Sequence, residues 1–512
     1  MFLRNLLSAM EKYKARNAFC IHDVYYTYGD LLSLTASICG QIERERPSTG
    51  EDKIIAVLCT DDIRTYASLL AIWFSGCAYV PLGLHNPTER NLTILGDAGC
   101  KVLLSTAELT DPRYSAFTVI TPGSTPASAD PASASAHPAS TSRDIVLAAS
   151  KEHDPAYILF TSGSTGTPKG VPISYANLAS FVRAFSRSPY TLGEDDRCLQ
   201  MFELTFDVSI SSFLLPLLHG ACIYTIPDGA IKYMGVLKLL HQHKLTSIQI
   251  VPSVIKLAQP LLPKLNFPSV RQCILTGEAT PVDLLPLWEP CVPNAAILNF
   301  YGPTEATIYT SFYPYDRKEL KSYNGLMAIG KAFSGMDLLV VNDNGAEAGP
   351  GEKGELLIGG PQLTRGYLNN PDINRTAFLE RRTGDSIKRF YRSGDLCFLD
   401  ETGDIFYCGR LDNQVKIRGY RVELGEIEYQ VRKFFDINSV VIVSKDKTGM
   451  VVLGLILETQ DASKLQAVLG HLKNKLPDYM IPGYIRTIKE FPLNTSGKTD
   501  RKKIKELIVE PA

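Results

Sequence analysis

The stretch YILFTSGSTGTPKGVPIS, from Tyr157 to Ser174, gathers hydroxyl side chains and glycines around one lysine, Lys169, directly after an apolar run. Glycines let the backbone turn its amide N–H groups inward, hydroxyls donate hydrogen bonds, and the lysine adds a positive charge. These groups together indicate a loop that binds phosphate oxygens; an ordinary polar turn is the alternative. The loop is not a Walker A motif, because Gly170 follows the lysine and no GxxxxGK[ST] occurs in the chain.

A strand and a helix must hold this loop in place. The apolar residues ILF at 158–160 predict the end of a β-strand. Ser174 predicts the N-cap of a helix whose apolar face carries Leu178, Phe181 and Phe185. A loop between a strand end and a helix start is a common position for an anion site.

Apolar runs that alternate with helical patterns predict the main fold. Three such runs are IIAVLC at 54–59, AYVPL at 78–82 and KVLLS at 101–105. This rhythm is typical of βαβ units and a largely parallel sheet. Residues 351–361 and 400–410 predict hairpins of a small β-barrel-like unit. We therefore expect the α/β class, with a large N-terminal domain of layered αβ subdomains over residues 1–411.

Two parts of the chain differ from this pattern. The C-terminal hundred residues combine helical stretches, GEIEYQVRKFF and SKLQAVLGHLKNKL, with apolar runs, SVVIVS and VVLGLILE. They predict a small, mobile α+β domain over 412–512. Residues from about 121 to 142, TPGSTPASADPASASAHPASTS, cannot bury a core. We expect them to form an exposed, flexible insertion.

Length, charge and cysteine content narrow the possible classes. The chain has 512 residues, too many for one core, and 53 basic against 54 acidic residues. This balance does not indicate nucleic acid as a partner. The eleven cysteines show neither CxxC nor zinc-type spacing, which favours reduced thiols and the cytoplasm. The N-terminus predicts an amphipathic helix rather than a signal peptide, and we expect no membrane span, which needs roughly 20 consecutive apolar residues.

Six motifs follow one another along the chain. They are TSGSTGTPKG at 161–170, FDVS at 206–209, NFYGPTEATI at 299–308, YRSGDL at 391–396, GRLDNQVKIRGYRVELGEIE at 409–428 and NTSGKTDRK at 494–502. In this order and spacing they resemble the adenylate-forming enzymes, specifically the amino-acid adenylation domains of nonribosomal peptide synthetases and the free-standing D-alanine:carrier-protein ligases. The resemblance covers nearly the whole chain.

The resemblance implies an AMP-forming ligase that uses ATP and Mg2+ in two steps. A carboxylate first attacks the α-phosphorus of ATP, which gives an acyl-adenylate and pyrophosphate, and a thiol then displaces AMP. Charge builds on phosphate oxygens in the first transition state, so fixed donors and a metal ion lower the barrier. By motif match, Glu305 would help to hold Mg2+; a solvated carboxylate at a helix start is the alternative.

The motif match also assigns a nucleotide site. Tyr301 would stack on adenine, with a core tyrosine as the alternative, and Asn299 would lie beside the base edge. Asp395 would bind the ribose hydroxyls with help from Arg410, for which a purely structural role is the alternative. The other matched ATP-binding positions are Thr161, Ser162, Gly163, Ser164, Thr165, Gly166, Lys169, Phe300, Gly302, Pro303, Thr304, Tyr407, Cys408 and Gly409.

Lys498 matches the mobile lysine of the family, which approaches both the substrate carboxylate and the α-phosphate. One ammonium about 4 Å from an anion contributes roughly 4 kcal/mol at an effective dielectric constant near 20. The alternative is a solvated lysine in a basic stretch. With Thr165 and Glu305, Lys498 completes the expected catalytic set. The small domain would rotate about a hinge at Asp412, with Lys416 stabilising one orientation, so that a thiol could enter where Lys498 had been.

The substrate class depends on Asp207. A carboxylate within the apolar frame of Phe206, Val208 and Ile210 costs several kcal/mol unless it meets a cation. An α-ammonium group would supply that cation, and the amino-acid activators of the family use this aspartate for it, so an amino acid is preferred over a fatty acid. The matched positions around the substrate are Asp207, Val208, Ser211, Ile250, Ile274, Thr276, Phe300, Ile308 and Tyr309, with Lys498 on the carboxylate.

The acceptor is expected to be a separate, phosphopantetheinylated carrier protein, because the chain ends a dozen residues after Lys498 without a carrier module. D-alanine:carrier-protein ligases typically have a cysteine where Thr276 stands, so the identity of the amino acid stays open. Two alternatives remain: a carboxylic acid:coenzyme A ligase, and a non-catalytic nucleotide- or amino-acid-binding protein on the same scaffold.

Overall fold

The computed structural model describes residues 2–45, 53–123, 145–163, 167–412, 414–446, 449–492 and 499–508. Most of the expected insertion, from 124 to 142, lies outside the described residues. The chain forms two compact units. The first contains Met1–Leu84, Leu95–Leu159 and Gly170–Leu411, and the second contains His85–Ile94, Phe160–Lys169 and Asp412–Ala512.

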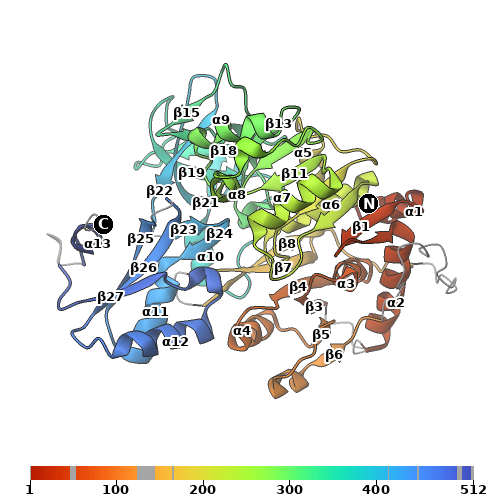
Figure 1. Cartoon of the computed structure of the whole chain (residues 1–512), viewed down its shortest axis with the longest axis horizontal. Coiled ribbons are helices and arrows are strands. Elements are labelled where there is room, and N and C mark those ends of the chain that lie inside the picture. The colour runs from red at the N-terminus through yellow and green to blue at the C-terminus, as the bar shows by residue number, and fades with distance from the viewer. Residues whose placement is uncertain are drawn as a thin grey trace. The chain divides into compact units, whose positions relative to one another are not determined.

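Two sheets form the framework of the first unit (Figure 1). One sheet has the order β6 (Thr118–Ile120), β5 (Val102–Ser105), β3 (Ile54–Cys59), β4 (Ala78–Gly83), β7 (Pro155–Thr161), β8 (Lys169–Ser174). The other has the order β17 (Lys331–Ala332), β14 (Ser311–Pro314), β13 (Ala296–Tyr301), β12 (Gln272–Leu275), β11 (Ser247–Ile250), β9 (Arg197–Gln200), β10 (Cys222–Thr225), β1 (Asn17–Ile21), β2 (Val24–Thr27).

Most neighbouring strands of these sheets run parallel, which confirms the predicted α/β class. In the first sheet, β3 pairs in parallel with β4 and β5, and β5 pairs in parallel with β6. In the second sheet, the parallel pairs are β1 with β10, β10 with β9, β9 with β11, β11 with β12 and β12 with β13. In the second sheet, antiparallel pairs lie toward the edges, at β1 with β2, β13 with β14 and β14 with β17. In parallel sheets the carboxyl ends of the strands lie at one edge, where binding residues gather.

Helices connect and cover these strands. Those of the first unit are α1 (Phe2–Lys12), α2 (Tyr28–Glu45), α3 (Ile63–Phe74), α5 (Tyr175–Phe185), α6 (Asp207–His219), α7 (Lys232–His243), α8 (Pro252–Ala258), α9 (Leu285–Trp288) and α10 (Pro371–Ala377), while α4 (Thr88–Ala98) spans both units. The predicted N-terminal amphipathic helix is confirmed, because α1 buries Leu3, Leu6 and Met10 on one face.

The predicted N-cap of α5 is also confirmed. The Ser174 hydroxyl accepts a hydrogen bond from the Asn177 backbone N–H at 3.1 Å, and Asn177 Oδ1 accepts one from the Ser174 N–H at 3.0 Å. This reciprocal pair satisfies two backbone donors that a helix start leaves without intrahelical partners.

A small antiparallel sheet completes the first unit. It consists of β18 (Asp337–Val341), β19 (Gly354–Gly359), β21 (Ser386–Leu399) and β20 (Phe378–Thr383), with β22 (Ile405–Arg410) on β21. Residues 400–410 carry the turn between β21 and β22, as predicted. The hairpin predicted at 351–361 is wrong, because this stretch supplies only β19, whose hairpin partner β18 lies further upstream. A short pair, β15 (Ser322–Tyr323) and β16 (Leu326–Met327), lies nearby in the chain.

The second unit has its own elements. They are the hairpin β23 (Gln414–Ile417) and β24 (Tyr420–Glu423), the sheet β25 (Ser439–Lys445), β26 (Val451–Glu458) and β27 (Tyr484–Ile488), and the helices α11 (Leu424–Phe435), α12 (Lys464–Lys475) and α13 (Arg501–Ile508). The two helices and two strands predicted in this region are confirmed. Val431, Leu455 and Leu472 are buried in their common core.

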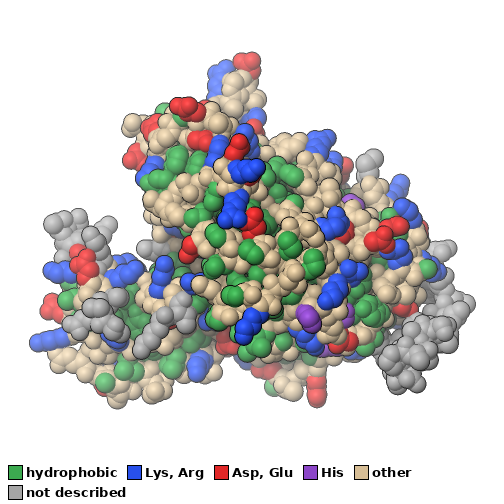
Figure 2. All heavy atoms as spheres, turned by 45° about the horizontal axis from the view of Figure 1, so that its top comes forward, with side chains coloured by type: hydrophobic (Ala, Val, Ile, Leu, Met, Phe, Trp, Pro, Cys, Tyr) green, Lys and Arg blue, Asp and Glu red, His purple; other side chains and the backbone are tan. Residues whose placement is uncertain are grey.

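Charged side chains mix over the surface in view in Figure 2, where acidic and basic groups alternate and neither sign covers a broad area. In the part of the chain that the structure describes, no helix is both long and apolar enough to cross a membrane.

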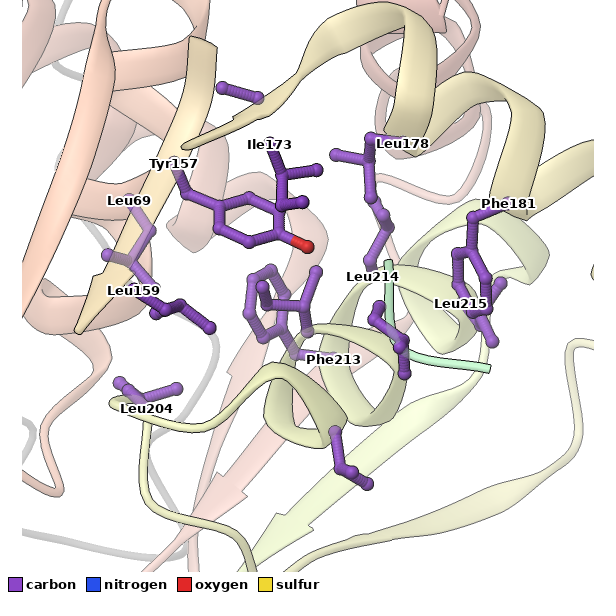
Figure 3. Packing of buried hydrophobic residues seen from close by; sticks show 14 of the residues in the cluster. Leu69, Tyr157, Leu159, Ile173, Leu178, Phe181, Leu204, Phe213, Leu214 and Leu215 are labelled. Atoms are coloured by element: carbon purple, nitrogen blue, oxygen red, sulfur yellow. The ribbon is translucent and has the colours of Figure 1, made fainter. Parts of the chain in front are cut away.

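Aromatic side chains fill the main core of the first unit. Figure 3 shows Tyr157 and Leu159 on β7 next to Phe213 and Leu214 on α6, with Ile173 and Leu178 beside them. The Tyr157 ring stacks on the Tyr79 ring at 5.8 Å between centroids. Its hydroxyl is buried and has no hydrogen-bond partner among the described residues. Burial, and after it the charge of Asp207, raises the pKa of Tyr157 well above its usual range.

We expect Tyr157→Phe to increase the free energy of unfolding by about 1 kcal/mol, because it removes a buried hydroxyl that lacks a partner. Tyr175→Phe is the matched control. The Tyr175 hydroxyl donates to the Cys77 carbonyl at 2.7 Å, so its loss should lower the free energy of unfolding by about 1 kcal/mol. Urea denaturation followed by the fluorescence of Trp73 and Trp288 measures both. A lower stability for Tyr157→Phe would contradict this account.

Candidate active site

The glycine-rich loop contributes its donors to the second unit. Thr161 ends β7 and Lys169 begins β8, while Ser164, Thr165 and Gly166 lie outside the described residues. The Gly163 backbone N–H donates to Glu426 Oε2 at 3.2 Å, and Lys169 Nζ lies 3.6 Å from Glu423 Oε1. A Cβ atom at Gly163 would lie 1.9 Å from the Thr167 carbonyl oxygen, so only glycine fits there. The loop thus offers N–H and ammonium donors to anionic oxygens.

The hydroxyl of Ser162 holds the same loop to β24. It donates to the Arg421 carbonyl at 3.0 Å and accepts from the Glu423 backbone N–H at 3.1 Å. Gln414 Nε2 donates to Glu423 Oε1, and Arg421 Nε donates to Gln414 Oε1 at 2.8 Å. The motif KIRGYRVE at 416–423 therefore contacts the predicted phosphate loop.

A buried ion pair fixes α11 in this unit. Arg90 Nη1 and Glu426 Oε1 lie 2.7 Å apart, and their side chains are 5% and 1% exposed. Nothing in the sequence indicated this pair, because the two residues lie 336 positions apart. Two charges buried together need close geometry and further hydrogen bonds to offset their desolvation, and Gly163 supplies one of these bonds.

Three predicted nucleotide residues meet in the first unit. Tyr301, the last residue of β13, donates its hydroxyl proton to Asp395 Oδ2, and Arg410 Nη1 donates to Asp395 Oδ1 at 2.8 Å. Burial and the neighbouring Asp395 raise the pKa of Tyr301 well above its usual range. Asp395 and Arg410 are direct cross-strand partners on β21 and β22. Their register therefore brings a carboxylate, a guanidinium and an aromatic ring together.

Other predicted nucleotide-binding residues lie on the same two strands, β13 and β22. Asn299 Nδ2 donates to the Ala328 carbonyl at 2.8 Å, and its Oδ1 accepts from Thr280 Oγ1 at 2.8 Å. Both ends of this amide are thus bonded within the protein. Tyr407, Cys408 and Gly409 lie on β22 and lead into Arg410, and burial raises the pKa of Cys408.

The turn after β13 positions Glu305. A Cβ atom at Gly302 would lie 2.3 Å from the Ile308 carbonyl oxygen, which requires glycine there. Thr307 and Ile308 both have positive φ, 57° and 73°, a conformation that costs about 1–3 kcal/mol for each such residue. Pro303 and Thr304 open the short 3-10 turn η5 (Thr304–Ala306), whose Glu305 is fully buried and accepts a hydrogen bond from the Tyr367 hydroxyl at 2.7 Å.

The predicted substrate residues lie around the first turn of α6. Asp207 is the first residue of this helix and is 8% exposed. The positive end of the helix dipole favours a carboxylate at this point. Burial raises the pKa of Tyr309, and the negative charge of Asp207 makes a smaller contribution in the same direction. Val208 and Ile308 are both buried in the main core cluster.

One expected substrate position, Ile250, lies on the other face of the sheet from Ile274. Ile250 packs in the second core cluster with Ile248 and Leu275, on the face of the sheet opposite to Ile274. The neighbouring Gln249 pairs in register with Ile274 and is bonded to Ser211 and Tyr309. Successive side chains of a strand point to opposite faces, so a shift of one position exchanges the two. The polar Gln249 within the otherwise apolar SIQI run was the available signal.

The residues expected to act as hinge and mobile lysine are described only in part. Asp412 Oδ1 accepts from the Gln414 backbone N–H at 3.1 Å, and Lys416 is an exposed residue of β23. Lys498 lies outside the described residues.

A family model for AMP-binding enzymes matches residues 7–368 of the chain. The chain belongs to the AMP-binding enzyme family. This membership confirms the resemblance inferred from the six motifs.

Individual members of the AMP-binding family resemble the chain along most of its length. The D-alanine--D-alanyl carrier protein ligase of Bacillus cytotoxicus is 30% identical over 525 residues, with 98% of each chain covered. Delta-poly-L-ornithine synthetase of Acinetobacter baumannii is 31% identical over 94% of this chain, which spans only 35% of that protein. The crystal structure of the Vibrio cholerae adenylation domain AlmE with glycyl-adenosine-5'-phosphate superposes with a TM-score of 0.83 at 27% identity, covering 99% of this chain and 97% of AlmE.

The buried pair of Arg90 and Glu426 gives a stability prediction for the second unit. Glu426→Ala leaves an uncompensated buried guanidinium and should lower the local free energy of unfolding by about 3–5 kcal/mol. The double variant Arg90→Met/Glu426→Met should restore much of this loss, because it removes both charges. Native-state hydrogen exchange of the α11 amides measures both effects.

Glu89→Ala is the matched control, since Glu89 pairs with Lys475 at 3.9 Å near the surface. Its effect on the same amides should stay within about 1 kcal/mol. Equal effects of Glu89→Ala and Glu426→Ala would contradict the assigned role of the buried pair.

Proposed function

We propose that the chain activates an amino acid with ATP and transfers it to the phosphopantetheine thiol of a separate carrier protein in the cytoplasm. The observation that carries this proposal is the buried carboxylate of Asp207 at the start of α6. A substrate ammonium group would form a buried charge pair with this carboxylate. The names of the full-length relative, a D-alanyl carrier protein ligase, and of AlmE with a glycyl-adenylate support the same substrate class.

In the first step, a carboxylate oxygen of the amino acid forms a bond to the α-phosphorus, and the bond from this phosphorus to the bridging oxygen breaks. Pyrophosphate leaves with the electron pair. The role of the chain is to hold the reacting groups and to stabilise charge. Ser162, Gly163 and Lys169 would bind the β- and γ-phosphates; Gly163 and Lys169 already contact carboxylate oxygens in the structure, and the Ser162 hydroxyl donates to the Arg421 carbonyl. Tyr301, Asp395 and Arg410 would hold the nucleoside.

Glu305 would serve as the protein ligand of Mg2+. Its carboxylate is fully buried, and the Tyr367 hydroxyl occupies one side of it. Mg2+ usually takes one or two carboxylates and completes its shell with water and substrate phosphates, so a single buried glutamate fits this ion. When bound, Mg2+ neutralises charge on the phosphate oxygens.

In the second step, the thiol sulfur forms a bond to the carbonyl carbon, the bond from this carbon to the phosphate oxygen breaks, and AMP leaves. Residues 1–411 would act as the adenylation domain and 412–512 as the mobile domain, with Asp412 and Lys416 at the hinge. In the structure, the Gly163 N–H and the Lys169 ammonium bind the carboxylates of Glu426 and Glu423. The phosphates of ATP would need the same two donors. This competition supports two exclusive arrangements of residues 412–512 relative to the glycine-rich loop, one for each step. Buried free thiols such as Cys100, Cys198 and Cys273 support a reducing compartment.

ATP–pyrophosphate exchange with a panel of amino acids, acetate and fatty acids tests the proposal. We expect exchange with at least one amino acid and none with fatty acids. Asp207→Ala should lower kcat/KM for that amino acid by at least about 100-fold, which corresponds to losing a buried charge pair of about 3 kcal/mol. A matched control is Asp195→Ala, an exposed aspartate in the segment before β9. Exchange with fatty acids instead would favour the coenzyme A ligase, and no exchange at all would favour a binding protein.

Lys498→Ala separates the two half-reactions. We expect it to abolish exchange while transfer from a supplied aminoacyl-adenylate to carrier protein remains within about threefold, because an ammonium that stabilises the first transition state is not needed in the second. Lys503→Ala, an exposed lysine in the same region, should leave both steps intact. Equal loss of both steps in Lys498→Ala would overturn the assignment. Transfer to coenzyme A in place of carrier protein would identify the alternative acceptor.

A further inference from the structure

The hairpin of β1 and β2 and the end of α7 bring three side chains together that commonly bind metal ions. Cys20 is the fourth residue of β1, and His22 and Asp23 form the two-residue turn to β2, both with positive φ, 52° and 63°. Asn-Gly is the usual pair in such a turn. His243 is the last residue of α7, which belongs to the same unit as the hairpin. Asp23 and His243 meet although they lie 220 positions apart.

The distances within this group suit a metal ion. The Cys20 sulfur, a carboxylate oxygen of Asp23 and a ring nitrogen of His243 all lie within 4.8 Å of one another. Bonds of about 2.0–2.3 Å at tetrahedral angles place two ligand atoms of Zn2+ about 3.3–3.8 Å apart. Small side-chain rotations would therefore enclose an ion. Within the described ranges of the chain, no other group of three or more such side chains comes this close.

Hydrogen bonds hold two of the three ligands in place. Asp23 Oδ1 accepts from His243 Nε2 at 2.9 Å and from Gln242 Nε2 at 3.1 Å. His243 Nδ1 lies 3.4 Å from the Tyr25 hydroxyl oxygen. Both ring nitrogens thus face oxygen atoms rather than the Cys20 thiol, which disfavours a thiol–imidazole nucleophile. A cation can replace the Nε2 proton, while Nδ1 faces an outer oxygen as in most metal-bound histidines.

The protein surrounds two of the ligands and leaves the third at the surface. Cys20 is 3% exposed, and the side chains of His243 and Asp23 are 9% and 51% exposed. Tyr25 and Tyr224 are the register partners of Cys20 on β2 and β10, and the Tyr224 ring lies 4.8 Å from the His243 ring. The sulfur and the imidazole are therefore anchored by packing. The carboxylate marks the path by which an ion enters from solvent.

We propose that Cys20, Asp23 and His243 bind a divalent transition-metal ion of the Zn2+ type, with water as the fourth ligand. Thiolate, imidazole and carboxylate are all ligands of Zn2+, whereas Mg2+ and Ca2+ are bound through oxygen atoms. Binding releases the thiol proton of Cys20 and the Nε2 proton of His243 to solvent. The two negative ligands then balance the charge of the ion, which lowers the cost of holding it away from water.

Metal binding by the tag-free full-length protein tests this site. After treatment with EDTA and its removal, the chain should retain one Zn2+ through gel filtration. Co2+ binds the same ligand types and serves as a spectroscopic probe. A thiolate ligand gives Co2+ an intense near-ultraviolet charge-transfer absorption, which we expect for the wild-type protein. Excess Zn2+ should also raise Tm, because an ion that binds the folded state stabilises it by mass action.

Single substitutions assign the ion to these side chains. Cys20→Ala, Asp23→Asn and His243→Gln should each weaken Zn2+ binding at least about 100-fold, since changes in outer partners alone cost about 10–100-fold. Asp23→Asn keeps the shape of an exposed turn residue and so preserves the fold, which circular dichroism checks. The controls are His241→Gln, an exposed histidine on α7, and Cys39→Ser, a half-buried cysteine on α2. Both should retain the ion.

Several results would overturn the inference. It is wrong if the wild-type protein does not retain Zn2+, or if its Co2+ complex lacks the thiolate absorption. It is also wrong if Asp23→Asn folds and binds Zn2+ as tightly as the wild-type protein, or if either control loses the ion, since the ion then lies elsewhere. Loss of the thiolate absorption in Cys20→Ala, together with an unchanged Tm of Asp23→Asn in excess Zn2+, would support it. Because the readout is metal binding, the result does not depend on amino-acid activation.

Discussion

The site depends on placing carboxylates in the protein interior and giving each of them a donor. Asp395 is 6% exposed and is held by Arg410 and Tyr301. Glu426 is 1% exposed and is held by Arg90 and the Gly163 N–H. A buried carboxylate without such partners would take up a proton or destabilise the fold. The positions of these acidic groups therefore dictate where the basic and N–H groups of the structure must lie.

The parallel sheets make this arrangement possible. Thr276 directly follows β12, and Tyr301 ends the neighbouring strand β13. Because parallel strands end at one edge, residues far apart in sequence gather there without long side chains. The antiparallel pairing of β21 and β22 also positions site residues, because its register places Asp395 opposite Arg410. Rigid strands, more than loops, thus set the distances in the predicted nucleotide group.

The sequence sufficed where a local rule determines structure. The N-cap at Ser174, the amphipathic α1 and the α/β alternation each depend on residues within a few positions of one another, and the structure bears them out. Contacts that depend on the fold could not be inferred. Arg90 and Glu426 have no local signal, and the hairpin expected at 351–361 failed because its strand pairs with β18 across a longer turn.

Ile250 shows a different limit, because motif matching locates the end of a strand but not the face to which each side chain points. A strand offers one side chain to each face in turn, so an alignment that is correct to within one residue still assigns the wrong side chain. Gln249, one residue earlier, is the side chain of β11 that contacts Ser211 and Tyr309. Motif residues such as Asp395 do not have this ambiguity, because the motif identifies them by residue type rather than by their number of positions along a strand.

Recognition of an amino acid by this chain would combine two interactions of different strength. Asp207 offers a charge near the start of α6, and a charge attracts any amino acid equally. Selectivity must then come from a group that distinguishes side chains. A neutral amide can do so, because removing its N–H donors from water costs less free energy than burying a second charge. A preorganised neutral donor beside a general anchor is therefore a physically economical way to choose among amino acids.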